Sequence, residues 1–538
     1  MTRYLKKYVI INFMNKIKID INKLKTIGFY LLLFVLSLAM TTKSNGYDFD
    51  LWARLIAGMA VVQTGQILKY DFLSYTPTQA WYDHEWGSSV VFYLFKNLGG
   101  TYGLLFLQAL LIFLTMFFLV KTVKVKFAEK CNCENILIFF IILNAFLVTY
   151  SSLIRCHSFT FLFFAFELYL LELVRKNQNY KLLFILPLLF LIWGNMHGGV
   201  VSGLGLLVMY TIGEALNKKN FKYYLIASLI CPLMLFINPY GAEFVKFLLS
   251  ATTMHRPDVL EWYPIFNKMT IFKFMTFKIF AIFVLIMELI KVIKNKINYK
   301  SFDKTKFMVL LITLYLAIIH IKMMPFFVLS ATIFCYKDVI DLFKNIKFPK
   351  YGMVFLNIFL LIFSVALMSI KTWKPMVKCK LYPILEVEFI KENQLKGNIL
   401  VNFGLGSYVA YKLYPQNKIY MDGRYEEVYD DYLLEDMSKT FTLSKGWYNL
   451  FEKNSPDIII IEKFYPLYKG LKQKKSGWKL AFEGLKFGVF VKTEKFPTDL
   501  KMPTLDFNYY KQSLFDTNIT FKGENRIKIE EINKRNDK

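Results

Sequence analysis

Long apolar runs separated by short, lysine-rich connections make up residues 27–372. The runs that approach the length needed to cross a bilayer lie near 27–42, 101–120, 135–153, 158–174, 181–195, 199–216, 223–238, 271–290, 307–321, 325–342 and 351–370. They predict an α-helical polytopic membrane bundle of about eleven spans. The count has a margin of about two, because the runs at 181–195 and 199–216 are short enough to be re-entrant.

The orientation of the bundle follows from the basic residues in the short connections, which favour the cytoplasmic side. When the basic N-terminus (1–26) is set inside, all strongly basic short loops fall inside as well; they lie around 121–130, 175–181, 218–222, 291–306 and 344–350. An odd number of spans then places the C-terminal region outside. No small-residue cleavage site follows the first run, so we expect a retained signal anchor.

After Lys371 the pattern changes to an alternation of short strands and helices. Strands are predicted at 398–402, 418–421, 457–461, 479–483 and 488–492, and helices at 405–413, 425–440 and 464–474. Such alternation favours a small α/β domain with a largely parallel sheet. We place this outward-facing domain at 373–497 and expect the polar tail at 498–538 to be disordered.

Composition supports a membrane protein, since 55% of the residues are hydrophobic and only 20% are charged. The net charge of +27 could indicate a nucleic-acid-binding protein. However, the basic residues cluster in loops between apolar runs, and no nucleic-acid-binding module is recognisable, so we exclude that class. Cys131 and Cys133 lack a second pair of ligands, which argues against a zinc site.

The segment 43–100, between the first two predicted spans, is the most unusual part of the chain. We interpret it as a large first outer loop with two acidic clusters. Asp48 and Asp50 follow the first apolar run directly, and the second cluster reads Asp83-His84-Glu85-Trp86. Carboxylates at the mouth of a membrane bundle indicate chemistry on a lipid-borne or membrane-proximal substrate.

The predicted topology places further polar residues on the same outer face. They are Arg155, His157, His197, Arg256, Glu261 and Lys322. Four of the five histidines lie in these outer loops, and His320 lies near the same face. The topology was derived from basic loops alone, so this convergence is independent of it. Ionisable groups gathered at one face of a bundle are candidates for a functional site.

This layout resembles the GT-C superfamily, whose members are membrane glycosyltransferases that use polyprenyl-phosphate or polyprenyl-pyrophosphate sugars. The matching features are Asp48 and Asp50 in the sequence YDFD, the large first outer loop, the bundle and the outward C-terminal domain. The motifs DHEW, NMHGG and MDGRYEEVY are similar to those of uncharacterised bacterial membrane proteins of this type. A WWD signature of oligosaccharyltransferases is missing, which argues against transfer of a preassembled oligosaccharide to protein.

The resemblance implies an inverting sugar transfer at the outer face of a prokaryotic cytoplasmic membrane, to a glycan, lipid or protein acceptor. Such a transfer needs a base for the acceptor hydroxyl. Asp50 is the first candidate and Asp48 the second. On a helix the two would lie about 200° apart, so only one could face the cleft. Positive charge must stabilise the leaving phosphate, and it could come from Arg155, Arg256, Lys322 or a divalent metal ion.

The remaining outer residues have several possible roles. Asp83, His84, Glu85, His157 and His197 could bind substrate, orient a carboxylate or complete a metal site. Purely structural roles are the alternative. An acid after a span is often a helix cap, and an arginine at a span end often extends its charged group to the membrane surface.

Two other classes of protein fit the same layout. A transporter or flippase for a lipid-linked or anionic substrate would need ionisable residues near the bilayer midplane and repeated spans. We find no clear repeat. A non-catalytic envelope assembly protein would depend on the C-terminal domain more than on Asp48 and Asp50.

Overall fold

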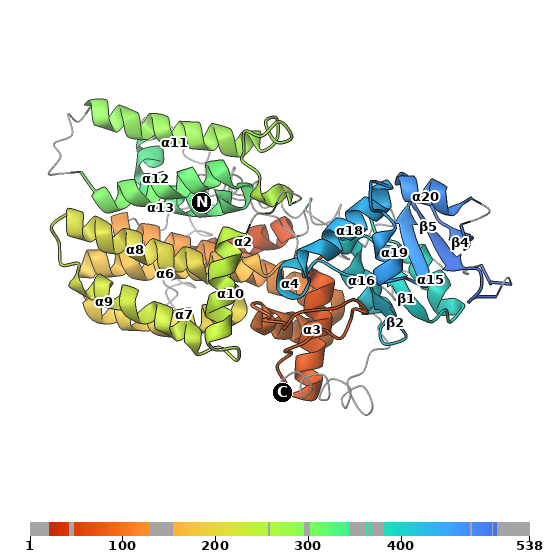
Figure 1. Ribbon diagram of the computed structural model, residues 1–538. Coiled ribbons are helices and arrows are strands. Elements are labelled where there is room, and N and C mark those ends of the chain that lie inside the picture. Colours follow the sequence, from red (N-terminus) through yellow and green to blue (C-terminus); the bar gives the residue numbers. More distant parts are fainter. Residues whose placement is uncertain are drawn as a thin grey trace, which may run out of the picture.

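The computed structural model describes residues 21–41, 48–127, 154–254, 256, 259–294, 302–343, 359, 362, 366, 381–473, 476–497 and 499–502. In this part of the chain a helical bundle lies beside a small domain with a β-sheet (Figure 1). The predicted span at 135–153, the domain boundary near 372 and the tail beyond 502 lie outside the described residues.

The bundle consists of α-helices and short 3₁₀ turns. The α-helices are α2 (Ile21–Thr41), α3 (Leu51–Thr64), α4 (Trp86–Phe127), α6 (His157–Asn177), α7 (Ile185–Met196), α8 (Val200–Leu216), α9 (Lys222–Ile230), α10 (Ala242–Thr253), α11 (Met275–Lys294), α12 (Lys304–Ile319) and α13 (Met324–Phe343). The turns are η1 (Tyr180–Phe184), η2 (Cys231–Phe236), η3 (Leu260–Trp262) and η4 (Ile321–Met323). Most of the predicted apolar runs therefore coincide with helices.

Two helices of the described chain, α4 and α6, are long and apolar enough to cross a membrane. Several shorter helices, among them α3 and α8, are also apolar. The count of about eleven spans stays a prediction.

The segment 43–100 is less of a loop than the sequence indicated. It contains α3 and the first part of α4, and the connection between them runs from residue 65 to 85. The α4 helix is interrupted at Gly99 and Gly100, where Gly100 has a positive φ of 55°. The first part of α4 packs closely on α3, because a Cβ atom at Gly58 would lie 1.9 Å from the Ser89 carbonyl oxygen.

The C-terminal domain has a five-stranded sheet in the order β2-β1-β3-β5-β4. Its strands are β1 (Gly397–Leu400), β2 (Asn417–Ile419), β3 (Ile458–Glu462), β4 (Trp478–Glu483) and β5 (Phe487–Lys492). Its helices are α15 (Ile384–Glu392), α16 (Phe403–Leu413), α17 (Tyr425–Val428), α18 (Asp431–Thr442), α19 (Asn449–Lys453) and α20 (Pro466–Leu471). The strands β2, β1 and β3 are parallel, whereas β5 and β4 are antiparallel, so the sheet is mixed rather than largely parallel. A short connection between residues 483 and 487 forms a hairpin, and a hairpin requires antiparallel strands.

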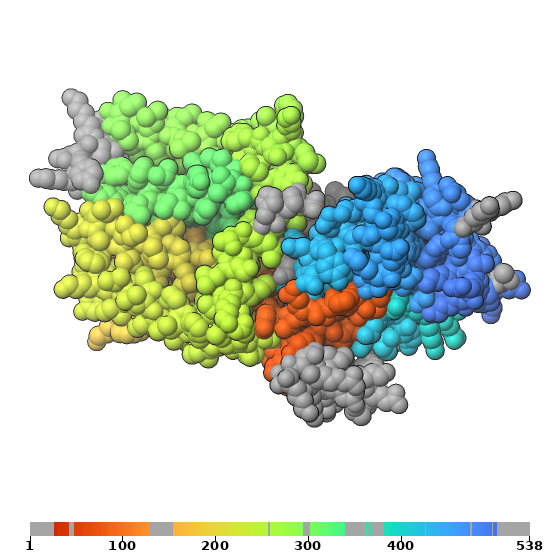
Figure 2. All heavy atoms as spheres, viewed as in Figure 1, coloured from red at the N-terminus to blue at the C-terminus, as the bar shows by residue number. Residues whose placement is uncertain are grey.

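The connection 65–85 is attached to the edge of this sheet. The backbone N–H of Tyr75 donates to the Ile419 carbonyl (3.0 Å), and the Ile419 N–H donates to the Leu73 carbonyl (3.0 Å). Because these bonds use backbone groups at the outer edge of β2, they cover a strand edge that would otherwise be unpaired. Figure 2 shows α3 and this connection, in orange-red, between the bundle and the blue C-terminal domain.

Apolar packing joins the same parts. Trp52 of α3 is fully buried and contacts the rings of Tyr408 and Tyr411 of α16, with centroids 5.1 and 5.2 Å apart. One hydrophobic core contains α3, the start of α4 and the interior of the C-terminal domain, while a second core fills the rest of the bundle. The segment 43–100 therefore shares its core with the C-terminal domain.

A buried ion cluster fixes this junction. Arg424 is 2% exposed, and it bonds Asp71 of the connection (2.7 Å) and Asp422 of its own domain (2.9 Å). Its guanidinium also lies over the ring of Trp81, 4.5 Å from the centroid. The motif Asp422-Gly423-Arg424 thus has a structural role, which joins the first outer segment to the sheet domain.

We expect Arg424→Ala to destabilise the protein by about 3–5 kcal/mol, because it leaves two buried carboxylates without their cation. The apparent melting temperature of the purified protein in detergent measures the effect. Lys495→Ala, which removes an exposed partner of Asp457, is the control and should cost at most about 1 kcal/mol. Equal melting temperatures for the two variants would contradict this account of the junction.

Candidate functional site

Three carboxylates surround the guanidinium of Arg155, which lies just before α6. Nε is 3.2 Å from Asp48 Oδ1, and Nη2 is 2.9 Å from Asp50 Oδ2. Nη1 is bonded to Glu261 Oε1 in η3. Asp48 and Asp50 precede α3 in a tight turn, where the Asp50 N–H donates to Asp48 Oδ1 (3.1 Å). Because neither is inside the helix, both carboxylates reach the same cation.

The two aspartates differ in environment. The side chain of Asp48 is 9% exposed, whereas that of Asp50 is 48% exposed. Burial raises the pKa of the Asp48 carboxyl to about 8, against the opposing effect of the Arg155 charge. Asp50 lines a small, partly open cavity, together with Arg54, Glu85, Arg155, Cys156 and His157, among others. Asp50 is thus the aspartate that a substrate could reach.

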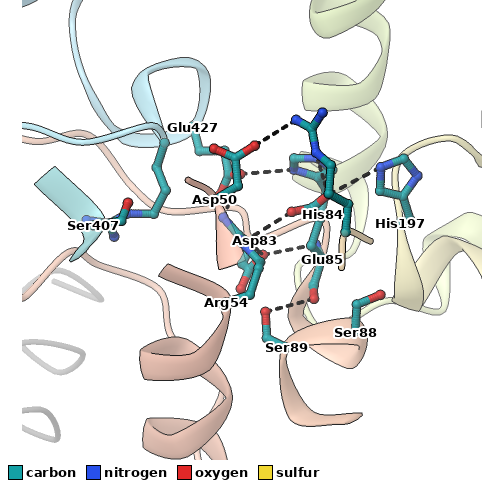
Figure 3. A network of polar contacts seen from close by, with 12 residues as sticks. Asp50, Arg54, Asp83, His84, Glu85, Ser88, Ser89, His197, Ser407 and Glu427 are labelled. Atoms are coloured by element: carbon teal, nitrogen blue, oxygen red, sulfur yellow. Dashed lines mark hydrogen bonds and ion pairs between the residues drawn. The ribbon is translucent and has the colours of Figure 1, made fainter. Parts of the chain in front are cut away.

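A second cluster surrounds Arg54 of α3 (Figure 3). Its guanidinium bonds three carboxylates, those of Asp83 (2.5 Å), Glu85 (3.2 Å) and Glu427 (3.1 Å). Glu427 comes from α17 of the C-terminal domain, and its other oxygen accepts a hydrogen bond from Trp81 Nε1 (2.6 Å). The cluster therefore joins the segment 43–100 to the C-terminal domain within their shared core.

Hydrogen bonds fix the orientation of His197, between α7 and α8. Its Nδ1 accepts the Gly199 N–H (2.9 Å) and lies 2.7 Å from Thr160 Oγ1. Since Nδ1 accepts, the proton of the neutral ring is on Nε2, which lies 3.2 Å from Glu85 Oε1. Burial lowers the pKa of His197, which favours this neutral form.

Three buried carboxyl groups surround Arg54, and its single positive charge cannot stabilise all three in the ionised form. Burial raises the pKa of Asp83 to about 6 and that of Glu427 to about 7, although Arg54 opposes both shifts. Burial also acts to raise the pKa of Glu85, but Arg54 and the hydrogen bond from His197 outweigh it and hold this pKa well below its usual range. Glu85 is therefore the firmly ionised acid of the cluster. His84 lies between the acids, with Nδ1 3.4 Å from Glu427 and Nε2 3.8 Å from Glu85.

The structure also locates the other residues expected at the site. His157 lines the cavity, and its ring centroid is 4.6 Å from that of His197. Arg256 and Lys322 lie over the ring of Trp262, 4.2 and 3.3 Å from its centroid. Trp262 directly follows Glu261, a partner of Arg155, in η3. His255 and Asp258, neighbours of Arg256 in the same predicted outer loop, lie outside the described residues.

Two residues of the site were missed by the sequence analysis. Arg54 is the one charged residue within α3, an otherwise apolar helix, and that isolation was the available indication. Glu427 lies in the MDGRYEEVY motif, 373 residues from Arg54 along the chain. Gly423 from the same motif lies against Asp50, since a Cβ atom there would be 2.8 Å from Asp50 Oδ1.

Two groups of described residues have three potential metal-ligand atoms within 4.8 Å of one another. They are His84, Glu85 and Glu427, and, at the other end of the bundle, Glu288, Cys335 and Asp338. The set formed by Asp48, Asp50 and Glu261 is not such a group. These acids are arranged around the flat guanidinium of Arg155 instead.

Comparison with known proteins shows likeness in fold but not in sequence. No family model and no curated protein matches the chain. Among solved structures, it is similar to the oligosaccharyltransferase AglB from Archaeoglobus fulgidus in complex with an inhibitory peptide and a dolichol-phosphate. The TM-score is 0.54 at 11% identity, over 90% of this chain and 77% of that one.

Two further structures of the Archaeoglobus fulgidus oligosaccharyltransferase are also similar. The apo form has a TM-score of 0.53 at 10% identity, over 80% of this chain and 69% of that one. The form tethered to an acceptor peptide has a TM-score of 0.51 at 10% identity, over 81% and 69%. The chain therefore shares the overall fold of the Archaeoglobus fulgidus oligosaccharyltransferase.

Proposed function

We propose that the chain is an integral membrane glycosyltransferase that moves a sugar from a polyprenyl-phosphate-type donor to an extracytoplasmic acceptor. The observation that carries this proposal is the meeting of Asp50, Arg155 and the cavity at the end of α3, in a fold shared with oligosaccharyltransferases. The site gathers a candidate base and a fixed positive charge within one hydrogen-bond length. An inverting transfer needs both.

The proposed location is a multi-pass position in the cell membrane, with the N-terminus in the cytoplasm and the C-terminal domain outside. In Figure 1 the sheet domain lies at one end of the bundle, so the whole of this domain would lie on one side of the membrane. The cavity residues come from that same end, at the start of α3 and of α6. Such a site would be open to a donor whose prenyl chain stays in the lipid.

In the proposed reaction Asp50 is the general base. Its exposed carboxylate accepts the proton of the acceptor hydroxyl, while the acceptor oxygen bonds to the anomeric carbon and the bond from that carbon to the phosphate oxygen breaks. The leaving phosphate keeps the electron pair of this bond, and the charge of Arg155 stabilises it. Asp48 is buried behind Asp50 and holds the turn and Arg155 in place.

The other residues divide into two groups. Arg256 and Lys322 beside Trp262 are proposed to contact the donor phosphate, together with Arg155. His157, a lining residue of the cavity, is proposed to contact substrate. Asp83, His84, Glu85 and His197 form the wall of the site through their bonds with one another and with Arg54. Glu427 brings the C-terminal domain into this wall.

The related structures bear on donor and acceptor. One is a complex with a dolichol-phosphate and an inhibitory peptide, and another is tethered to an acceptor peptide. They support a lipid-linked donor for this chain. A glycan, a lipid and a protein all stay open as acceptor classes.

The first prediction concerns Asp50. Cells that carry Asp50→Asn should accumulate a polyprenyl-linked precursor, as a deletion strain does, because the neutral amide cannot accept the acceptor proton. Glycan and glycolipid profiling by mass spectrometry checks this, with protein levels followed by immunoblot. Glu435→Gln, at an exposed carboxylate far from the cavity residues in sequence, is the matched control and should leave the profile unchanged. A wild-type profile for Asp50→Asn would remove Asp50 as the base.

The second prediction separates Asp48 from Asp50. Because burial raises its pKa to about 8, the Asp48 carboxyl is mostly protonated at pH 7. Asn resembles the protonated acid and keeps an oxygen that accepts from Arg155 and the Asp50 N–H. Asp48→Asn should therefore retain transfer within about threefold at pH 7, while Asp50→Asn loses it.

The raised pKa of Asp48 also predicts how the stability of the protein changes with pH. Because burial raises the folded-state pKa of Asp48 above its unfolded value, its proton favours the folded state, and stability falls as the pH rises from about 4 to about 8. Asp48→Asn should reduce this fall in the melting temperature. An unchanged pH profile of the melting temperature would contradict the assignment.

The third prediction tests the contribution of the C-terminal domain. Glu427→Ala removes the partner of Arg54 and Trp81 and should reduce transfer at least about tenfold, with a stability loss of about 1–3 kcal/mol. The control is Asp430→Ala, which removes an exposed hydrogen bond between the same domain and Gln79. If both variants lose transfer equally, the effect belongs to domain docking and not to the site.

A further inference from the structure

The positive charge at the centre of the site is the guanidinium of Arg155. Nε, Nη1 and Nη2 of Arg155 each bond a different carboxylate, from Asp48, Glu261 and Asp50. Carboxylate oxygens from separate segments are also the donor set that Mg²⁺ and Mn²⁺ prefer. Here they converge on a guanidinium instead.

With Arg155 in place, the three carboxylates are spaced for the guanidinium and not for an ion. One ion can bind three oxygens only if they lie within a few ångströms of one another, since its bonds are about 2.0–2.2 Å long. Around a guanidinium the oxygens are spread along the edge of a flat fork. Accordingly Asp48, Asp50 and Glu261 are not among the groups whose ligand atoms come within 4.8 Å of one another.

The two groups that do come this close are also bonded to side-chain cations. Arg54 bonds both Glu85 and Glu427. At the other end of the bundle, Lys291 bonds both Glu288 and Asp338. In the described part of the chain, each of these acid clusters already has a basic side chain within it.

We infer that Arg155 is the permanent cation of the site, in the place where a divalent metal ion would otherwise bind, and that sugar transfer proceeds without such an ion. The second half of this inference rests on the proposed function, whereas the first half concerns cation binding alone.

The chemistry of Arg155 fits this role. A guanidinium keeps its charge at any physiological pH and has five N–H groups. The carboxylates use three of them, which leaves two for the oxygens of a phosphate. The side chain is 18% exposed, so its charge acts in a medium of lower permittivity than water. Burial of Asp48, with its raised pKa, reduces the negative charge that Arg155 must balance.

The test uses Mn²⁺ alone as the probe, on purified full-length protein in detergent after treatment with EDTA. Electron paramagnetic resonance counts bound Mn²⁺, and the melting temperature reports stabilisation by binding. We expect the wild type to bind no Mn²⁺ that depends on Asp50, so wild type and Asp50→Asn should give the same signal. One ion per chain that is lost in Asp50→Asn would overturn the inference.

Removal of the guanidinium should create the missing site. Arg155→Ala leaves three carboxylates without a cation, so their side chains can turn toward the vacated space. The variant should gain one bound Mn²⁺ per chain together with a rise in melting temperature on addition of Mn²⁺. Arg155→Ala with Glu261→Gln should lose this gain. If folded Arg155→Ala binds no Mn²⁺, the carboxylates are not a cation site that Arg155 fills, and the inference fails. If Arg155→Ala does not fold, the comparison of wild type with Asp50→Asn decides alone.

A separate assay tests the catalytic half. Membranes from wild-type cells should transfer the native lipid-linked sugar within about twofold of the untreated rate in excess EDTA, relative to membranes from a deletion strain. A loss of more than tenfold that Mn²⁺ restores would overturn it. If wild-type and deletion membranes do not differ at all, the proposed function fails, whereas the Mn²⁺ results still decide what occupies the centre of the site.

Discussion

A buried guanidinium has to be paired on nearly every side, and this requirement connects the parts of the molecule. Arg54, Arg155 and Arg424 each bond acids from segments far apart in the sequence. Removing a partner from such a cluster leaves an uncompensated charge in a poorly solvated place, at a cost of about 1–5 kcal/mol. The segment 43–100, the bundle and the C-terminal domain therefore cannot separate without leaving charged side chains unpaired. The ion pairs thus hold the cavity residues in their relative positions.

As a consequence, the two arginine clusters of the site differ in how far their acids are exposed to solvent. Around Arg54 the acids are enclosed and bonded to that guanidinium, and burial is the largest cause of the raised pKa values of Asp83 and Glu427. Around Arg155 one acid is buried and one is exposed, so the same cation can hold Asp48 in place while Asp50 faces the cavity. Two carboxylates two residues apart thus acquire different properties from their surroundings alone.

The C-terminal domain is part of this arrangement and not an appendage. Its edge strand is extended by the first outer segment, its helix α16 packs on Trp52, and its Glu427 and Gly423 reach the two arginine clusters. A transferase built in this way would couple the fit of its outer domain to the geometry of its base. The solved oligosaccharyltransferases share the overall fold, but at about one residue in ten identical they leave the chemistry of this site to its own residues.

The sequence by itself determined the apolar helices, the change of pattern after residue 371 and the five strands, because each depends on local periodicity that a few neighbouring residues express. It also identified Asp48, Asp50 and the outer-face histidines as candidates, since polar residues beside apolar runs stand out. Only the tertiary structure decided that α3 shares a core with the sheet domain, that β4 and β5 are antiparallel, and that Arg54 meets Glu427 across 373 residues. These features depend on which distant surfaces pack together and which charges then need partners. The local sequence pattern contains no information about either.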